Sequence, residues 1–158
     1  PVDGKKPISV FESGAILLYL AEKTGRFLPR EGAARYQTIQ WLMFQMGGVG
    51  PMFGQLGFFH RYRGSEIEDK RPRDRYVNEA RRLLGVLDRQ LDGREWITGE
   101  YSIADIAIAP WVNTLAQGYK AGELLGLDEF VRVGAWVERF LARPAVQRGM
   151  LVGAAPAA

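Results

Sequence analysis

The sequence predicts a mainly α-helical bundle that follows a short remnant of β structure. Apolar side chains recur at three- and four-residue steps from Ser13 onward, and residues typical of helix starts and stops bound these stretches. A strand pattern occurs only within the first dozen residues. With 158 residues, 47% of them hydrophobic and 25% charged, the chain is suited to one globular unit with a packed core.

The N-terminal segment predicts an incomplete β structure. Residues 8–11, Ile-Ser-Val-Phe, have the composition of a short strand, and Asp3-Gly4 is a hairpin signal. Only two residues precede that turn, whereas a partner strand needs about five. We therefore expect residue 1 to be an interior position of a longer protein.

Five or six helices are expected after this strand. Gly25 suits a left-handed cap at the end of the first, and the glycines and proline of residues 47–51 should interrupt or kink the second. Acidic side chains are interleaved with basic ones over residues 61–75, which favours a solvated connection over a nucleic-acid surface. The helices are expected over residues 13–23, about 33–46, 52–62, 76–91, from 102 onward, and about 129–142.

The clearest helix start lies at Ser102. The Ser102 hydroxyl can accept a hydrogen bond from a backbone N–H of the first turn. Asp105, three residues later, can accept a hydrogen bond from the Ser102 backbone N–H. This pattern is a capping box, and its cap should stabilise the protein by about 1 kcal/mol. We therefore assign Ser102 and Asp105 to structure and not to catalysis.

Composition excludes several kinds of chemistry. The chain has no Cys and one His, so thiol nucleophiles, disulfides and thiolate zinc sites are excluded, and we expect no metal site. No apolar run is long enough for a membrane span, and no signal peptide is recognisable. The net charge is only +3, too small to indicate nucleic-acid binding, and we expect a cytoplasmic protein.

The turn from the strand to the first helix has the most chemical content. Free backbone N–H groups and the helix dipole favour an anion there, and Ser13 could hold its carboxylate. Glu12 beside it favours an ammonium, so the pair suits the zwitterionic end of an amino acid. The alternative is that either residue simply caps the helix and that Glu12 is solvated.

Three segments of the chain resemble segments of one protein family, and they occur along the chain in the same order as in that family. ESGAILLYLAEKTG, residues 12–25, resembles the end of the thioredoxin-like domain of glutathione transferases, and YSIADIAIAPWV, residues 101–112, resembles a helix of their helical domain. QWLMFQMGGVGPMFGQ, residues 40–55, is similar to the bacterial, nu-type branch related to the yeast nitrogen-regulator prion protein. Members of that branch tend to be glutathione-dependent disulfide reductases.

The resemblance implies both a fold and a ligand. It implies the last strand and helix of a thioredoxin-like domain over residues 1–28 and an all-helical glutathione transferase C-terminal domain over 29–158. Glutathione would be the co-substrate, with Glu12 and Ser13 on its γ-glutamyl end. Arg75 would lie near its glycine carboxylate; the alternative for Arg75 is a plain solvated charge.

The same resemblance implies that the groups near the glutathione sulfur, and a cis-proline, precede Ile8 and are absent here. The intact protein is expected to catalyse glutathione-dependent conjugation of a small electrophile or reduction of a disulfide, whereas this chain alone should be inactive. A homodimer is expected. The alternative is a noncatalytic, dimerising helical interaction module.

Residues after the glycine-rich segment form a second candidate site. Met and aromatic side chains there could line a pocket for the hydrophobic second substrate, although the same spacing is typical of core packing. These residues are Met52, Phe53, Gln55, Phe58 and Phe59.

Overall fold

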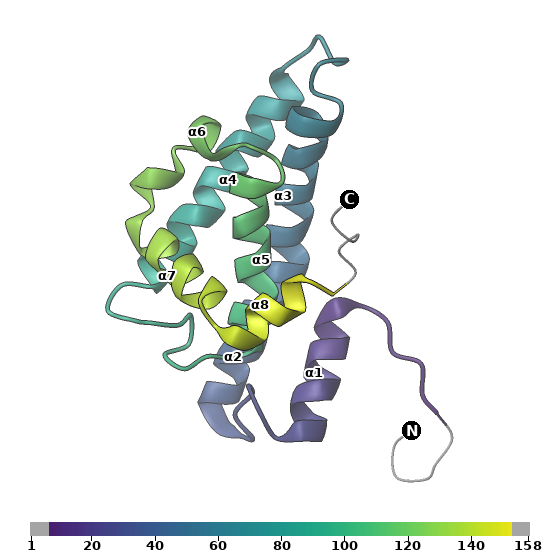
Figure 1. Cartoon of the computed structure of the whole chain (residues 1–158), viewed down its shortest axis with the longest axis vertical. Coiled ribbons are helices and arrows are strands. Elements are labelled where there is room, and N and C mark those ends of the chain that lie inside the picture. The colour runs from purple at the N-terminus through teal and green to yellow at the C-terminus, as the bar shows by residue number, and fades with distance from the viewer. Residues whose placement is uncertain (1–6, 153–158) are drawn as a thin grey trace.

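A computed structural model describes residues 7–152 of the protein and contains eight α-helices over that range (Figure 1). Two short π-helices, η1 and η2, and one 3₁₀ turn, η3, accompany them. The helices are α1 (Ser13–Thr24), α2 (Gly32–Phe44), α3 (Gly50–Gly57), α4 (Arg71–Gln90), α5 (Ile103–Gln117), α6 (Gly122–Leu125), α7 (Val131–Leu141) and α8 (Pro144–Met150).

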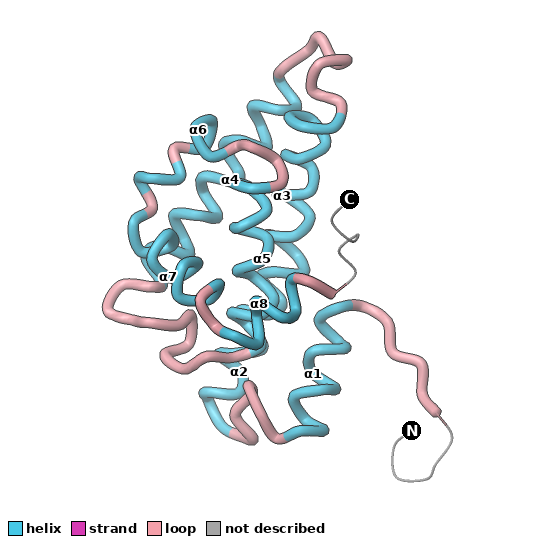
Figure 2. Tube along the Cα trace, in the orientation of Figure 1, coloured by secondary structure: helices cyan, strands magenta, loops and turns pink. Residues whose placement is uncertain are grey.

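The mainly α fold is confirmed, whereas the strand expected at residues 8–11 is wrong. Figure 2 shows this segment as an extended loop before α1, and no residue from 7 to 152 is in a strand. The physical reason is that a strand exists only through hydrogen bonds to a neighbour, and no other described segment pairs with residues 8–11. The hairpin signal Asp3-Gly4 lies outside the described residues.

Residues 32–62 form one long helical rod instead of two helices separated by a break. The glycine-rich segment is accommodated by η1 (Gln45–Val49), in which the Gly50 N–H donates to the Gln45 carbonyl five residues back. A second π-turn, η2 (Phe58–Tyr62), ends the rod with the Arg63 N–H donating to the Phe58 carbonyl at 2.9 Å. Each wide turn absorbs an extra residue, so the rod continues into α3 and ends at Tyr62 as expected.

The charged connection is shorter than expected, because α4 already begins at Arg71. Pro72 occupies the first turn of α4, where its missing N–H costs nothing. The Asp69 carboxylate accepts the Arg71 backbone N–H at 3.0 Å and so satisfies one of the free donors of that turn. Pro144 likewise opens α8, a helix that the sequence patterns did not predict.

The main core lies between α3, α4, α5 and α7. Its fully buried members include Phe53 of α3, Leu84 of α4, Ile108 of α5 and Trp136 of α7. A second, smaller cluster attaches α1 to α2 and α5; its buried members are Ala21, Leu28, Leu42 and Ile103. Over residues 7–152, no helix is both long and apolar enough to cross a lipid bilayer.

The capping box at Ser102 is confirmed, and its carboxylate does more than cap a helix. Asp105 is fully buried and accepts the Ser102 N–H at 2.9 Å. It also accepts the Ile97 N–H at 3.0 Å and the Trp136 indole N–H at 2.9 Å. Burial raises the pKa of the Asp105 carboxyl, and these donors oppose that shift. The Asp105 side chain thus connects three parts of the chain: the loop before α5, the start of α5, and helix α7.

We expect Asp105→Ala to lower the free energy of unfolding by about 3 kcal/mol or more. The substitution leaves the Ile97 and Trp136 N–H groups buried without an acceptor, at about 1–3 kcal/mol each. Ser102→Ala removes the cap and one donor to Asp105, the Ser102 hydroxyl at 3.1 Å, but it leaves the Ile97 and Trp136 N–H groups paired with Asp105. It should therefore cost less, about 1 kcal/mol. Urea unfolding followed by circular dichroism measures both, and equal losses for the two variants would contradict this role of Asp105.

Candidate functional site

The candidate site is the N-terminus of α1. Glu12 is its N-cap residue and Ser13 its first helical residue, and both side chains are exposed. The Glu12 carboxylate makes no capping hydrogen bond, so the interpretation of Glu12 as a side-chain cap is wrong. The first backbone bond of the helix runs from the Ile16 N–H to the Glu12 carbonyl at 2.9 Å, which leaves the preceding N–H groups of the turn for another acceptor.

The backbone at Glu12 is strained. Its φ is +68° and its ψ is +119°, a conformation that L-residues other than glycine rarely adopt. Such a conformation costs about 1–3 kcal/mol and persists only where the surrounding structure imposes it. Strained residues of this kind cluster at functional sites.

The chemistry of this turn fits a zwitterion. The free N–H groups and the positive end of the α1 dipole attract a carboxylate, to which the Ser13 hydroxyl can also donate. The exposed Glu12 carboxylate can accept from an ammonium group on the same ligand. No group of three or more metal-ligating side chains is found in the part of the chain from residue 7 to 152.

α1 is held at its C-terminal end by α5. Gly25 caps α1 in the left-handed conformation, as expected, and the chain then turns back toward the bundle. The Ile103 N–H, in the first turn of α5, donates to the Phe27 carbonyl at 2.9 Å. The position of the candidate site therefore depends on the start of α5, which Asp105 holds.

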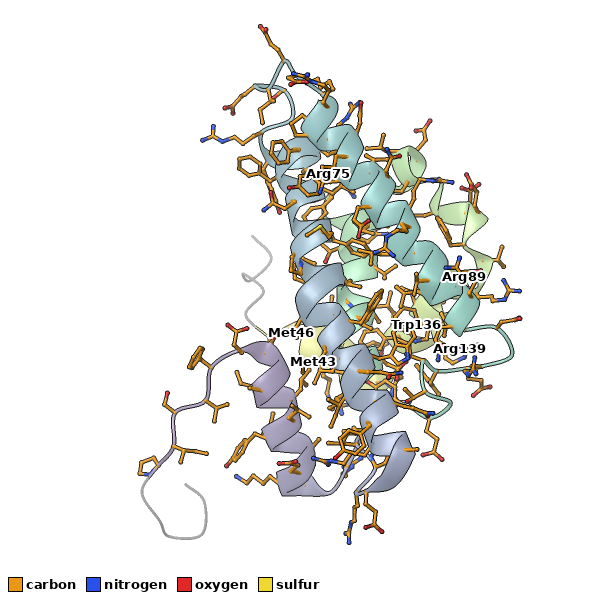
Figure 3. The ribbon with its side chains drawn as sticks, turned by 180° about the vertical axis from the view of Figure 1, so that it is seen from behind. Met43, Met46, Arg75, Arg89, Trp136 and Arg139 are labelled. Carbon is orange, nitrogen blue, oxygen red and sulfur yellow. The ribbon has the colours of Figure 1, made fainter. Side chains whose placement is uncertain are left out.

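The N-terminal end of α1 is held by a methionine. The Ser13 hydroxyl donates to the Met46 Sδ at 3.7 Å, and Figure 3 shows Met46 of η1 directed at this end of α1. Gly14 is buried against the same side chain. The sequence patterns did not single out Met46 as part of the site. Its contact with Ser13 joins positions 33 residues apart, and helical periodicity does not indicate which helices pack together.

Arg75 lies in a separate hollow, toward the other end of the bundle from Met46 (Figure 3). It is an exposed side chain on α4, and the hollow is also lined by Met52, Tyr76 and Glu79. Arg82, through its hydrogen bonds to Glu79, lowers the pKa of the Glu79 carboxyl, and Arg75 adds to that effect. The structure does not bring Arg75 against Glu12 or Ser13.

The second candidate site divides between core and surface. Phe53 is fully buried in the main core, which is the packing role that its spacing also allowed. Phe59 stacks on Tyr76 with 5.5 Å between ring centroids. Met52 packs on the core beside the Arg75 hollow, whereas Gln55 and Phe58 are exposed.

Comparisons with known proteins identify the family. Residues 52–144 match the family described as the glutathione S-transferase C-terminal domain. The disulfide-bond oxidoreductase YfcG of Escherichia coli K12 is 45% identical over 152 residues, an alignment that covers 96% of this chain and 67% of YfcG.

Two solved structures have the same fold. A Pseudomonas putida glutathione transferase with one glutathione disulfide bound per subunit is 62% identical, with a TM-score of 0.93, and the match covers 96% of this chain and 66% of that one. A Burkholderia graminis glutathione transferase with two glutathione molecules bound per subunit is 60% identical, with a TM-score of 0.94. That match covers 98% of this chain and 64% of the Burkholderia chain.

This chain therefore spans about two thirds of the length of these relatives. The identities, the matched family domain and the shared fold lead to one conclusion. The chain belongs to the glutathione S-transferase family, in the branch of the YfcG-like disulfide-bond oxidoreductases.

Proposed function

We propose that this chain supplies the helical domain and the γ-glutamyl part of the glutathione site of a glutathione-dependent enzyme. The enzyme would conjugate glutathione to a small electrophile or use it to reduce a disulfide. The observation that carries the proposal is the N-terminus of α1, where free N–H groups, the Ser13 hydroxyl and the exposed Glu12 carboxylate lie together. Glutathione or its disulfide occupies the related Pseudomonas and Burkholderia structures.

Each group of the turn has a defined part in binding. The α-carboxylate of the γ-glutamyl residue accepts from the N–H groups at the start of α1 and from the Ser13 hydroxyl. The ammonium group of the same γ-glutamyl residue donates to the Glu12 carboxylate. The strained backbone at Glu12 aims this residue away from an ordinary capping geometry, which keeps its carboxylate free for the ligand.

Arg75 is proposed as a cation for the glycine carboxylate of glutathione. Its exposure on α4 leaves it accessible, and the neighbouring hollow is large enough for a peptide end group. Glu79 in the same hollow competes for this cation, although Arg82 already holds Glu79 at 2.8 Å. A solvated surface charge is the alternative for Arg75.

The division into two units is also part of the proposal. Residues 1–28 would belong to a thioredoxin-like domain and residues 29–158 to the helical domain, within which the family match at 52–144 falls. Bound glutathione supplies the thiolate that attacks the electrophile or disulfide. The residues of this chain bind and orient the peptide ends of glutathione.

We propose that these 158 residues alone bind glutathione no better than millimolar and have negligible activity. Three charge-assisted hydrogen bonds contribute about 1.5–3 kcal/mol each. Association costs about 4–15 kcal/mol before a net gain appears, and millimolar binding corresponds to about 4 kcal/mol. The groups around the sulfur are proposed to precede Ile8, as the family resemblance implies.

A titration of the ¹⁵N-labelled chain with glutathione, followed by NMR, tests the site. The amides of Ser13 and Gly14 should shift with a dissociation constant of about 1 mM or weaker, and Ser13→Ala should weaken binding by about tenfold. Cysteinylglycine, which lacks the γ-glutamyl group, should leave these amides unmoved. Equal shifts with both peptides, or none at saturating glutathione, would contradict the proposal.

Two substitutions of Glu12 separate its backbone from its charge. Glu12→Gly removes the strain and should raise the free energy of unfolding by about 1 kcal/mol, while it weakens glutathione binding. Glu12→Gln retains the strain and should weaken binding without stabilising the protein. Thermal unfolding and the same NMR titration measure both effects. A Glu12→Gly variant no more stable than Glu12→Gln would show that the backbone is not strained.

A homodimer is proposed because apolar side chains in and before α1 are exposed, among them Phe11, Ile16 and Leu20. Analytical ultracentrifugation at about 100 μM should give twice the 17.7 kDa chain mass. A single 17.7 kDa species at that concentration would contradict the dimer.

A further inference from the structure

The first turn of α1 rests on Met46. A Cβ added at Gly14 would lie 3.1 Å from both the Cγ and the Sδ of Met46, closer than nearly all contacts of this kind. The Ser13 hydroxyl reaches the same sulfur at 3.7 Å. Two successive residues of the turn therefore contact one half-buried side chain of the helical bundle (Figure 3).

Met46 lies at the start of the π-turn η1 and faces α1. Met43, one turn earlier, belongs to α2 and is 46% exposed, whereas Met46 is partly buried within the wide turn Gln45–Val49. A flexible thioether fills the irregular space against the Gly14 backbone better than a branched side chain does.

We propose that Met46 is a positioning residue for the glutathione site. It supports the turn from Ser13 to Gly14 and so fixes the direction of the N–H groups. The Ser13 hydroxyl donates to the weak acceptor Met46 Sδ in the free protein and turns to the carboxylate when the ligand binds. This inference rests on the proposed function, because it concerns the same γ-glutamyl subsite. It extends that function to a residue of the helical domain that does not itself touch the ligand.

Glutathione titrations of four variants test the proposal by NMR. Met46→Ala removes the support and should weaken glutathione binding by about fivefold, whereas Met46→Leu, which conserves volume, should restore most of the affinity. Met43→Ala is the matched control and should bind like the wild type, because Met43 is 46% exposed and Met46, not Met43, contacts Ser13 and lies against Gly14. Thermal unfolding should show that each variant retains its fold.

The contact with Gly14 provides a second readout. Gly14→Ala forces Met46 away and should also weaken binding by about fivefold. In the double variant Gly14→Ala/Met46→Ala, the new methyl group occupies the space that Met46 leaves, so the loss should be smaller than the product of the two single losses. A merely structural contribution to stability would not produce this coupling in affinity.

The outcomes separate the two proposals. If the wild type binds glutathione, Ser13→Ala weakens it and Met46→Ala does not, the role of Met46 is overturned and the proposed function stands. Independent, multiplicative losses in the double variant also overturn it. If the wild type shows no shift at Ser13 and Gly14, the proposed function fails and the inference fails with it.

Discussion

The buried carboxylate of Asp105 is the interaction on which the arrangement of this protein depends. It accepts hydrogen bonds from the loop before α5, from the start of α5 and from Trp136 of α7. A carboxylate buried without such donors would be strongly destabilising, and burial indeed raises the pKa of Asp105. The start of α5 in turn donates through Ile103 to Phe27, after α1. These hydrogen bonds thus connect the segment that follows α1, and with it the candidate site, to the core.

The helical rod of residues 32–62 contacts both the main core and α1. Its α3 segment places Phe53 and Leu56 in the main core, whereas Met46, at the start of η1, contacts the first turn of α1. A regular helix through the same residues would change the relation between these two faces. The glycine-rich sequence permits the wide turn, because small residues let the backbone depart from the ordinary helical ladder.

Features that depend on local sequence were predictable, and features that depend on distant contacts were not. The capping box at Ser102 and the left-handed cap at Gly25 are local, and both formed as expected. The strand at residues 8–11 failed because pairing requires another segment. The positive φ of Glu12 has no sequence signal, since Glu is not a residue that prefers this conformation. Glu12 and Ser13 could be singled out by type and family resemblance, but their support by Met46 required the three-dimensional structure.

We propose above all that the turn between residue 11 and α1 binds a γ-glutamyl group. The most direct measurement is a crystal structure of this chain grown with about 20 mM glutathione, well above the expected millimolar dissociation constant. We expect glutathione with its γ-glutamyl carboxylate on the Ser13 and Gly14 N–H groups and its ammonium on Glu12, with the φ of Glu12 positive. Glutathione bound elsewhere, with this turn empty or Glu12 at a negative φ, would show that the turn is not a γ-glutamyl site.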